Sequence, residues 1–282
     1  NNTIQKDYFL PSLNLKYNLN DKNSFRLGAS KTYTLPQAKE ISPYRYVGVN
    51  FNSQGNPNLK PSDNYNLDLK WDFNPTPTEL ISLTAFYKLI KNPISRIEVA
   101  SAGGYLSYEN IADKATVAGV EIEIRKNLFV RPVSNAAHGM NKLSLGLNGS
   151  YIYTNAKMPL ATVTTGSQLE GAAPWIVNFD LSHNFTKGER SFVNTLVLNY
   201  VSDKIYTIGT QGYQDMMEQG VLTLDFVSQA KLNKHLSLNL KARNLLNPSY
   251  KLSRKANENG EKVILNDYKK GINISLGVSC TF

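Results

Sequence analysis

The stretch YKKGINISLGVSCTF, residues 268–282, alternates apolar with small or polar side chains up to its last residue. From Ile272 onward the even positions are apolar and end on Phe282, whereas the odd positions are Asn, Ser, Gly, Ser and Thr. Successive strand side chains point to opposite faces, so this pattern predicts a β-strand with one apolar face. Two environments fit such a strand. One is an antiparallel sheet between a core and water, and the other is a membrane barrel with lipid outside and a wet interior.

The same two-residue period recurs along most of the chain, as in LPSLNLKYNL (10–19), YNLDLKWDF (65–73), WIVNFDLSHNF (175–185) and LSLNLKAR (236–243). No comparable 3.6-residue apolar stripe is visible, so we expect little helix. The pattern predicts an all-β protein with about eleven antiparallel strands. Their expected spans are 10–19, 23–33, 63–73, 79–89, 115–126, 141–154, 173–186, 191–202, 220–232, 235–246 and 268–282.

The connections between these strands alternate between short and long. NDK, NPTPT, TKGER and NKH are short turns, whereas the links 34–62, 90–114, 155–172, 203–219 and 247–267 are long; the link 127–140 is an intermediate exception. Long loops at one end and short turns at the other are typical of an outer-membrane barrel. An odd number of strands leaves two open sheet edges, which lipid cannot satisfy. We therefore expect that the chain, which starts at Asn1, is incomplete and that another segment supplies the remaining strands.

Composition argues against several classes of function. The 282 residues carry a net charge of +9, but the basic residues are scattered, which disfavours a nucleic-acid-binding protein. The single cysteine gives no disulfide framework, and the three histidines are far apart, so we expect no metal site. No apolar run approaches the ~18 residues of a membrane helix. No nucleophile accompanies any carboxylate pair, so we expect neither enzymatic activity nor a cofactor.

Five short motifs occur in an order that is known from one family. GNPNLKPSDNYNLDLKWDF (55–73) resembles the NPxLKPE loop-to-strand motif of TonB-dependent outer-membrane transporters, with Ser62 in place of the usual Glu. Further elements of that family resemble LTAFYKLIKNPI (83–94), GVEIEIRKNL (119–128), KARNLLNPSYK (241–251) and the terminal Phe282. The resemblance is to the C-terminal half of a 22-stranded transmembrane β-barrel, in a Bacteroidetes-like style. It implies that residues 1–282 are the C-terminal portion of such a barrel, and that the plug domain and N-terminal strands are absent from this chain.

The resemblance also implies a function and a set of partners. In this family the receptor binds a large, scarce nutrient, such as a siderophore or a glycan, at extracellular loops and imports it across the outer membrane with TonB-relayed energy. The implied partners are outer-membrane lipid, the remaining strands and plug, the TonB complex, the barrel assembly machinery and, as an open question, a surface lipoprotein. Phe282 is the expected assembly signal. The alternatives are a soluble secreted β-sandwich that binds carbohydrate, and a passive porin.

Candidate site residues fall into two groups. Aromatic rings stack on sugars or flat chelates and arginine pairs with anions, so loop residues of these types are candidate ligand contacts, although the tyrosines also suit an aromatic girdle. The candidates are Tyr44, Arg45, Tyr46, Tyr105, Tyr108, Tyr206 and Tyr213. Charged residues that alternate with apolar ones are expected to face the barrel lumen, where they contact a plug or line hydrated space. These are Glu121, Glu123, Arg125, Lys241 and Arg243. Gly119 is expected to leave room in its strand.

Overall fold

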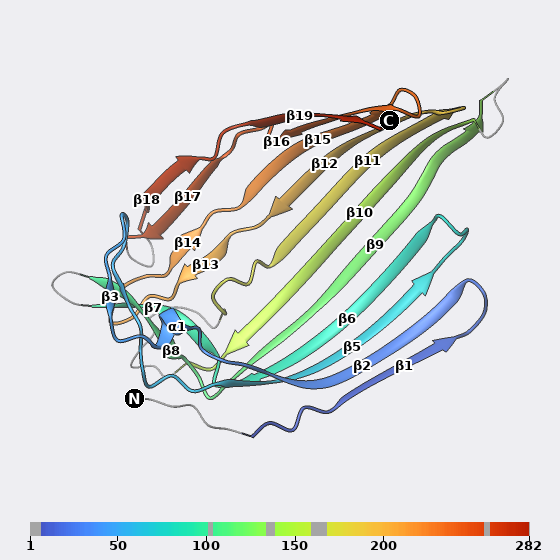
Figure 1. The fold of residues 1–282 in the computed structure, drawn as a ribbon. Helices are drawn as coiled ribbons and strands as arrows, with labels where there is room; N and C mark the ends of the chain where they lie inside the picture. The colour runs from blue at the N-terminus through green and yellow to red at the C-terminus, as the bar shows by residue number, and fades with distance from the viewer. Residues whose placement is uncertain (1–6, 101–103, 134–138, 159–167, 257–259, 282) are drawn as a thin grey trace.

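The fold is dominated by one antiparallel sheet of eleven strands, ordered β1-β2-β5-β6-β9-β10-β11-β12-β15-β16-β19 (Figure 1). The computed structural model describes residues 7–100, 104–133, 139–158, 168–256 and 260–281. Each strand of this sheet pairs with the strands that precede and follow it in this order, and β1 and β19 form the two edges. The strands are β1 (Ser12–Asn18), β2 (Asn23–Thr34), β5 (Ser62–Phe73), β6 (Leu80–Lys91), β9 (Lys114–Pro132), β10 (Met140–Ala156), β11 (Trp175–Lys187), β12 (Arg190–Val201), β15 (Val221–Lys231), β16 (Leu236–Arg243) and β19 (Asn273–Cys280).

These strands confirm the predicted all-β fold and correct two of its details. The last strand begins at Asn273 rather than at residue 268, because Gly271 adopts a φ of +79° and interrupts the extended backbone. Strand β9 continues to Pro132, beyond the predicted end at 126. Because β10 begins at Met140, only seven residues, 133–139, separate these two strands, and this link does not break the alternation of short and long connections.

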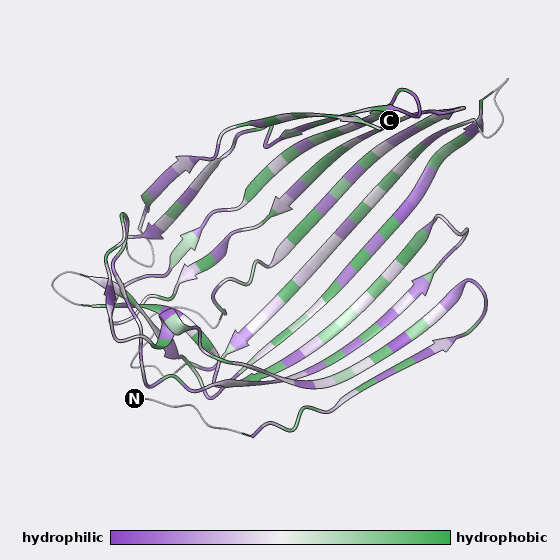
Figure 2. Ribbon diagram, in the orientation of Figure 1, coloured by the Kyte–Doolittle hydropathy of each residue, from purple (hydrophilic) through white to green (hydrophobic). Residues whose placement is uncertain are grey.

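The two faces of this sheet differ in chemistry, as the alternating colours along each strand in Figure 2 show. One face carries large apolar side chains that are exposed, including Leu69 at 53 %, Ile274 at 68 % and Leu276 at 71 %. On the opposite face polar side chains are buried, among them Asn64, Asp72 and Ser82. Within the described residues no second layer covers the apolar face. This arrangement disfavours the β-sandwich alternative, in which that face would form a dry core, and it matches a wall in contact with lipid.

Outward aromatic side chains cluster toward both ends of the apolar face. At the short-turn end, Trp71 and Phe73 lie with ring centroids 6.2 Å apart, and Phe185 lies 6.3 Å from Phe192. At the long-connection end the outward rings are Tyr65, Tyr87, Tyr151, Tyr153 and Trp175, with Tyr151 and Trp175 4.6 Å apart. Rings of this kind favour the boundary between lipid tails and water. The two clusters therefore mark the edges of the apolar belt.

A chain of amide hydrogen bonds crosses the polar face at mid-sheet. The Asn148 amide on β10 donates to Glu121 on β9 at 2.7 Å, and the Asn178 amide on β11 donates to Asn148 at 3.3 Å. The Asn199 amide on β12 in turn donates to the Asn178 oxygen. The strand register places Asn148 opposite Asn178 and Asn178 opposite Asn199. This amide ladder thus links four consecutive strands through their side chains as well as their backbones.

The long connections fold into two small sheets at one end of the main sheet, on the left in Figure 1. The first sheet joins β3 (Arg45–Tyr46), β4 (Ser53–Gln54), β8 (Tyr105–Asn110) and β7 (Ile94–Val99), and a single short helix, α1 (Ala38–Ile41), precedes it. The second joins β13 (Lys204–Thr207), β14 (Met216–Glu218), β17 (Ser249–Lys255) and β18 (Lys262–Lys269). We call them the first and second loop sheets. Among the described residues no helix is both long and apolar enough to cross a membrane.

Candidate functional site

The candidate site is a cavity of about 620 Å³ between the two loop sheets. Its walls come from four of the five long connections, so residues far apart in the sequence meet there. The lining residues are Lys39, Asn50, Phe51, Ser53, Arg96, Leu106, Tyr108, Tyr206, Glu218, Tyr250, Lys251, Leu252, Asn266 and Tyr268. A volume of this size lies within the range of small-molecule sites in proteins, about 300–1,000 Å³.

An apolar cluster holds the two loop sheets together and forms part of the cavity wall. Leu106 of the first sheet packs with Met216 and Leu252 of the second, and Phe51 and Tyr206 pack against them. Met216 is only 2 % exposed. Burying a side chain of this kind stabilises the contact by roughly 1.5–3 kcal/mol, so this cluster fixes the positions of two of the aromatic walls.

Backbone contacts join the same two sheets a second time. The amide of Ile208, just beyond β13, donates to the Arg96 carbonyl at 3.0 Å, and the Glu98 amide donates to the Ile208 carbonyl at 3.1 Å. The Glu98 carboxylate also forms an ion pair with Arg254 on β17, where both side chains are largely buried. The two loop sheets therefore form one body rather than two independent loops.

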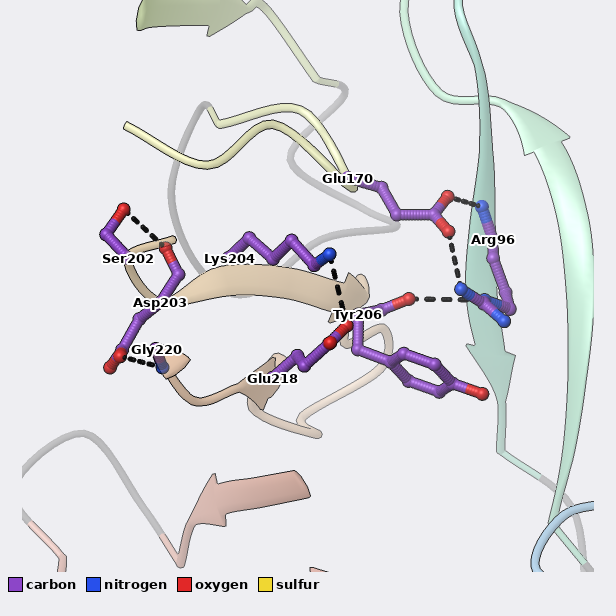
Figure 3. Close-up of polar contacts among 8 residues, drawn as sticks. All are labelled: Arg96, Glu170, Ser202, Asp203, Lys204, Tyr206, Glu218 and Gly220. Carbon is purple, nitrogen blue, oxygen red and sulfur yellow. Dashed lines mark hydrogen bonds and ion pairs between the residues drawn. The ribbon is translucent and has the colours of Figure 1, made fainter. Parts of the chain in front are cut away.

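Arg96 is held in place by four contacts on one side of the cavity (Figure 3). Its guanidinium lies 2.8 Å from the Glu170 carboxylate, and its backbone N–H donates to the same carboxylate at 2.5 Å. The Nε donates to the Tyr206 carbonyl at 3.2 Å, and the guanidinium carbon lies 4.0 Å from the centre of the Tyr206 ring. A guanidinium fixed in this way presents a pre-oriented positive charge to the cavity.

Burial shifts the pKa values of two acidic groups around Arg96. Burial raises the pKa of the Glu170 carboxyl, and the hydrogen bonds and charge of Arg96 only partly oppose this effect. Burial likewise raises the pKa of the Tyr108 phenol, again against the charge of Arg96. The Tyr108 hydroxyl therefore keeps its proton at neutral pH and presents a neutral donor to the cavity.

The second loop sheet supplies the cavity's acidic residue. Glu218 on β14 lies 3.4 Å from the Lys204 ammonium on β13, as Figure 3 shows. The Asp203 carboxylate, just before β13, accepts a hydrogen bond from the Gly220 N–H at 2.6 Å. This bond joins the start of the connection to its end, just before β15 of the main sheet. Because Glu218 is paired with Lys204, its charge is partly compensated within the sheet itself.

The cavity is therefore basic and rich in aromatic rings. Lys39, Arg96 and Lys251 outnumber the single carboxylate of Glu218 among its lining residues. Two carboxylates outside the lining partly compensate this charge: Glu170 lies 2.8 Å from Arg96 and Asp267 lies 3.8 Å from Lys251. Five rings line it, and those of Tyr250 and Tyr268 are stacked 5.5 Å apart. Such a surface suits a ligand that is both anionic and flat or aromatic. Among the described residues no group of three or more His, Cys, Asp or Glu side chains is arranged to hold a metal ion.

The structure brings some of the predicted loop residues to this cavity and separates others from it. Tyr108 and Tyr206 line it. Tyr105 lines a neighbouring cavity of about 370 Å³, and the Arg45 guanidinium lies 5.8 Å from its ring. Tyr44, Tyr46 and Tyr213 line neither of these cavities: Tyr44 is 74 % exposed, Tyr46 contacts Lys39, and Tyr213 lies beneath Arg254.

Sequence reasoning missed most of the lining. The missed residues include Lys39, Phe51, Arg96, Tyr250, Lys251 and Tyr268. The sequence pattern places Tyr268 in the last barrel strand, but it lies on β18 and pairs with Tyr250. The only sequence signal for Tyr250 and Lys251 is their place at the end of the motif KARNLLNPSYK, which indicates the family but not a cavity.

The charged residues on the main strands share the polar face. Glu121 is part of the amide ladder, and the Glu123 carboxylate lies 2.8 Å from Arg125 on the same strand. Lys241 pairs with Ser275 and Arg243 with Asn273 in the backbone register, so both alternate with the outward Leu240 and Ala242. Phe282, the expected assembly signal, lies outside the described residues.

Known proteins share both the sequence pattern and the fold. A curated relative, the iron-regulated outer membrane virulence protein of Vibrio cholerae serotype O1, is 25 % identical over 228 residues, which are 77 % of this chain and 32 % of the relative. The siderophore receptor PirA from Acinetobacter baumannii matches 97 % of the chain with a TM-score of 0.61 and 17 % identity. A variant of the ferric enterobactin receptor from Pseudomonas aeruginosa, in complex with enterobactin, also matches 97 % with a TM-score of 0.61 and 17 % identity.

These matches cover most of this chain but less than half of each similar protein. This chain spans about a third of the length of the curated relative, 41 % of the PirA chain and 40 % of the enterobactin receptor chain. The family model described as TonB dependent receptor-like, beta-barrel, matches residues 1–245, most of the chain. The exposed apolar belt, the loop sheets at one end and this match agree, and the chain belongs to the TonB-dependent receptor-like β-barrel family of the Gram-negative outer membrane.

Proposed function

We propose that this chain forms part of an outer-membrane receptor that binds a large, scarce nutrient at its extracellular loops and imports it with TonB-relayed energy. The observation that carries the proposal is the basic, aromatic cavity between the loop sheets, at the extracellular end of a lipid-facing wall. A cavity built from several loops on a rigid sheet is a typical arrangement for a binding site. The family match supports the same function.

The cargo that best fits the cavity is an anionic iron chelate with aromatic groups. Lys39, Arg96 and Lys251 supply positive charge, and the tyrosine rings supply flat surfaces for stacking. The named relatives include a siderophore receptor and a ferric enterobactin receptor, which is consistent with this class of ligand. A neutral glycan would use the rings but would gain nothing from the positive charges of Lys39, Arg96 and Lys251.

The proposal includes partners that lie outside this chain. The edge strands β1 and β19 carry backbone groups that lipid cannot satisfy, so we propose that further strands pair with both and complete the barrel. A plug domain would fill the lumen against Glu121, Glu123, Arg125, Lys241 and Arg243, and would relay the pull of the TonB complex. Assembly through the barrel assembly machinery, and a surface lipoprotein above the loops, are further parts of the proposal.

A paired binding experiment tests the cavity. The full-length protein in detergent is titrated with a ferric catecholate siderophore, with cobalamin and with a maltooligosaccharide, and protein fluorescence is recorded. The double variant Tyr250→Ala/Lys251→Ala is compared with Lys16→Ala/Tyr17→Ala, which removes the same two residue types at the short-turn end of the sheet. We expect at least a tenfold loss of siderophore affinity in the first variant and none in the second. Equal affinities in both would refute the assignment of the cavity.

Uptake measurements separate active import from a passive pore. Cells that carry the full-length protein are grown under iron limitation with and without a functional TonB complex. Import through the receptor should stop when TonB is absent, although binding at the surface remains. Uptake that continues at the same rate, in proportion to external concentration, would favour the porin alternative.

A further inference from the structure

A row of lysines crosses the outward face just beyond the tyrosines at its extracellular end. Lys31 on β2, Lys91 on β6 and Lys114 on β9 lie on the apolar face of their strands, because they continue the alternation that exposes Leu27, Tyr87 and Val120. Lys157 follows directly after β10 and is exposed. We call these four residues the lysine row.

The backbone register sets two of these lysines directly opposite each other. Lys91 pairs with Asp63 on one side and directly with Lys114 on the other. Like charges directly opposite each other destabilise a sheet. Asp63 compensates only one end of the row, where its carboxylate lies 3.8 Å from the Lys31 ammonium. Among the described residues no carboxylate lies within ion-pair distance of Lys91, Lys114 or Lys157.

The ring of Tyr65 lies close to two of these ammonium groups. The Lys31 Nζ lies 5.6 Å from the centre of the Tyr65 ring, and the Lys91 Nζ lies 5.3 Å from it. Both cations are therefore attracted to the same ring. This arrangement holds two positive charges immediately above an aromatic residue that belongs to the girdle at the lipid boundary.

The height of the row matches the outer edge of the apolar belt. Asp63, level with Lys91, and Phe73, in the opposite aromatic cluster, are the second and last residues of β5. At about 3.4 Å per residue and a tilt of about 35–45°, that length corresponds to roughly 25 Å along the membrane normal. The apolar band of such barrels is also about 25 Å tall. The lysine row thus lies where the charged headgroups of the outer leaflet begin.

From this geometry we propose that the lysine row binds the phosphate groups of outer-leaflet lipids. A phosphate placed between Lys91 and Lys114 would replace their repulsion by two charge-assisted contacts. The exposed apolar side chains below the row would contact the acyl chains of the same lipid. This site lies on the outside of the wall and is separate from the cargo cavity between the loop sheets.

Native mass spectrometry of the full-length protein in nanodiscs tests this proposal. The nanodiscs contain phosphatidylcholine with either bisphosphorylated lipid A or the same lipid A without phosphates. The variant Lys91→Gln/Lys114→Gln is compared with Lys187→Gln/Lys234→Gln, which removes two exposed lysines at the periplasmic end. Each lysine contributes about a fivefold attraction to an anionic surface, so the first variant should retain bisphosphorylated lipid A roughly 30-fold more weakly. The second should equal the unmodified protein.

Three results would overturn the proposal. Equal retention of lipid A by both variants would show that the row does not contact it. Equal retention of the phosphate-free lipid by the unmodified protein would show that only acyl chains are recognised. Displacement of the lipid by millimolar inorganic phosphate would assign the row to a free anion instead. Gel mobility without heating reports whether each variant is folded, and siderophore binding should be unchanged in all of them.

Discussion

Replacing Leu69 with arginine should destabilise the barrel in a way that depends on depth. Leu69 lies on the apolar face with 53 % of its surface exposed, midway along β5 between the outward rings of Tyr65 and Phe73. An arginine near the middle of the lipid belt costs about 2–4 kcal/mol. That free energy corresponds to roughly a 30- to 700-fold loss in the folding equilibrium constant.

The matched control is the neighbouring residue on the same strand. Asp68 points to the opposite, polar face, so Asp68→Arg places the same side chain in the hydrated interior and should change stability by about 0.5 kcal/mol or less. Tyr65→Arg, at the edge of the belt, should cost only about 0–1 kcal/mol. This series separates the effect of depth from that of the arginine itself.

Reversible urea unfolding of the full-length protein in lipid bilayers provides the measurement. The free energy of unfolding is extrapolated to zero urea for each variant, and the slopes are compared to check that the same surface is exposed. If Leu69→Arg and Asp68→Arg lost equal stability, the apolar face would not be in contact with lipid. If Tyr65→Arg cost as much as Leu69→Arg, the belt would extend further than the aromatic clusters indicate.

Three further predictions concern packing and charge. Met216→Ala should loosen the contact between the loop sheets by about 2–5 kcal/mol, seen as faster hydrogen exchange in β13 and β14 with β5 unchanged; equal exchange in the loops would contradict this. Gly119→Val should destabilise the barrel by about 1–3 kcal/mol in urea unfolding, because a Cβ at this position would lie 2.3 Å from the Phe86 ring and 2.5 Å from the Tyr151 carbonyl. Gly149→Val is the control, because a Cβ at Gly149 has space. The pKa of Glu170 is raised in the folded state, so that state binds the proton more tightly than the unfolded state does. Protection of β7 from hydrogen exchange, corrected for intrinsic rates, should therefore fall as the pH rises from the ordinary pKa near 4.5 to the raised one. Glu170→Gln should remove this pH dependence, and an unchanged dependence would reject the assignment.

The main sheet could be predicted because its signal is local and repeated. In YNLDLKWDF every second residue is apolar, and lipid on one side enforces that period along the whole strand. The predicted strand 63–73 therefore differs from β5 by one residue at its start. The faces of Glu121, Glu123 and Arg125 followed from the same alternation.

The loop sheets and the cavity were not predictable in the same way. Strands of two residues such as β3 and β4 are too short to show any period. Their partners are distant: Ser53 pairs with Leu106, and Met216 with Arg254. Arg96 reaches the cavity because Glu170 and Tyr206 hold it there, and no local pattern around Arg96 encodes those contacts. The space expected at Gly119 exists, but the Phe86 ring occupies it, which only the pairing of β6 with β9 reveals.

The amide ladder has a consequence for how the wall is assembled. Asn148, Asn178 and Asn199 lie opposite one another only when β10, β11 and β12 insert in the correct alignment. A slip by one position would turn Leu147 or Phe179 toward water and separate all the amides at once. A slip by two would keep the faces correct but would still break the side-chain bonds. The register of each newly added strand is thus fixed relative to the preceding strand by a side-chain hydrogen bond, which apolar side chains cannot form.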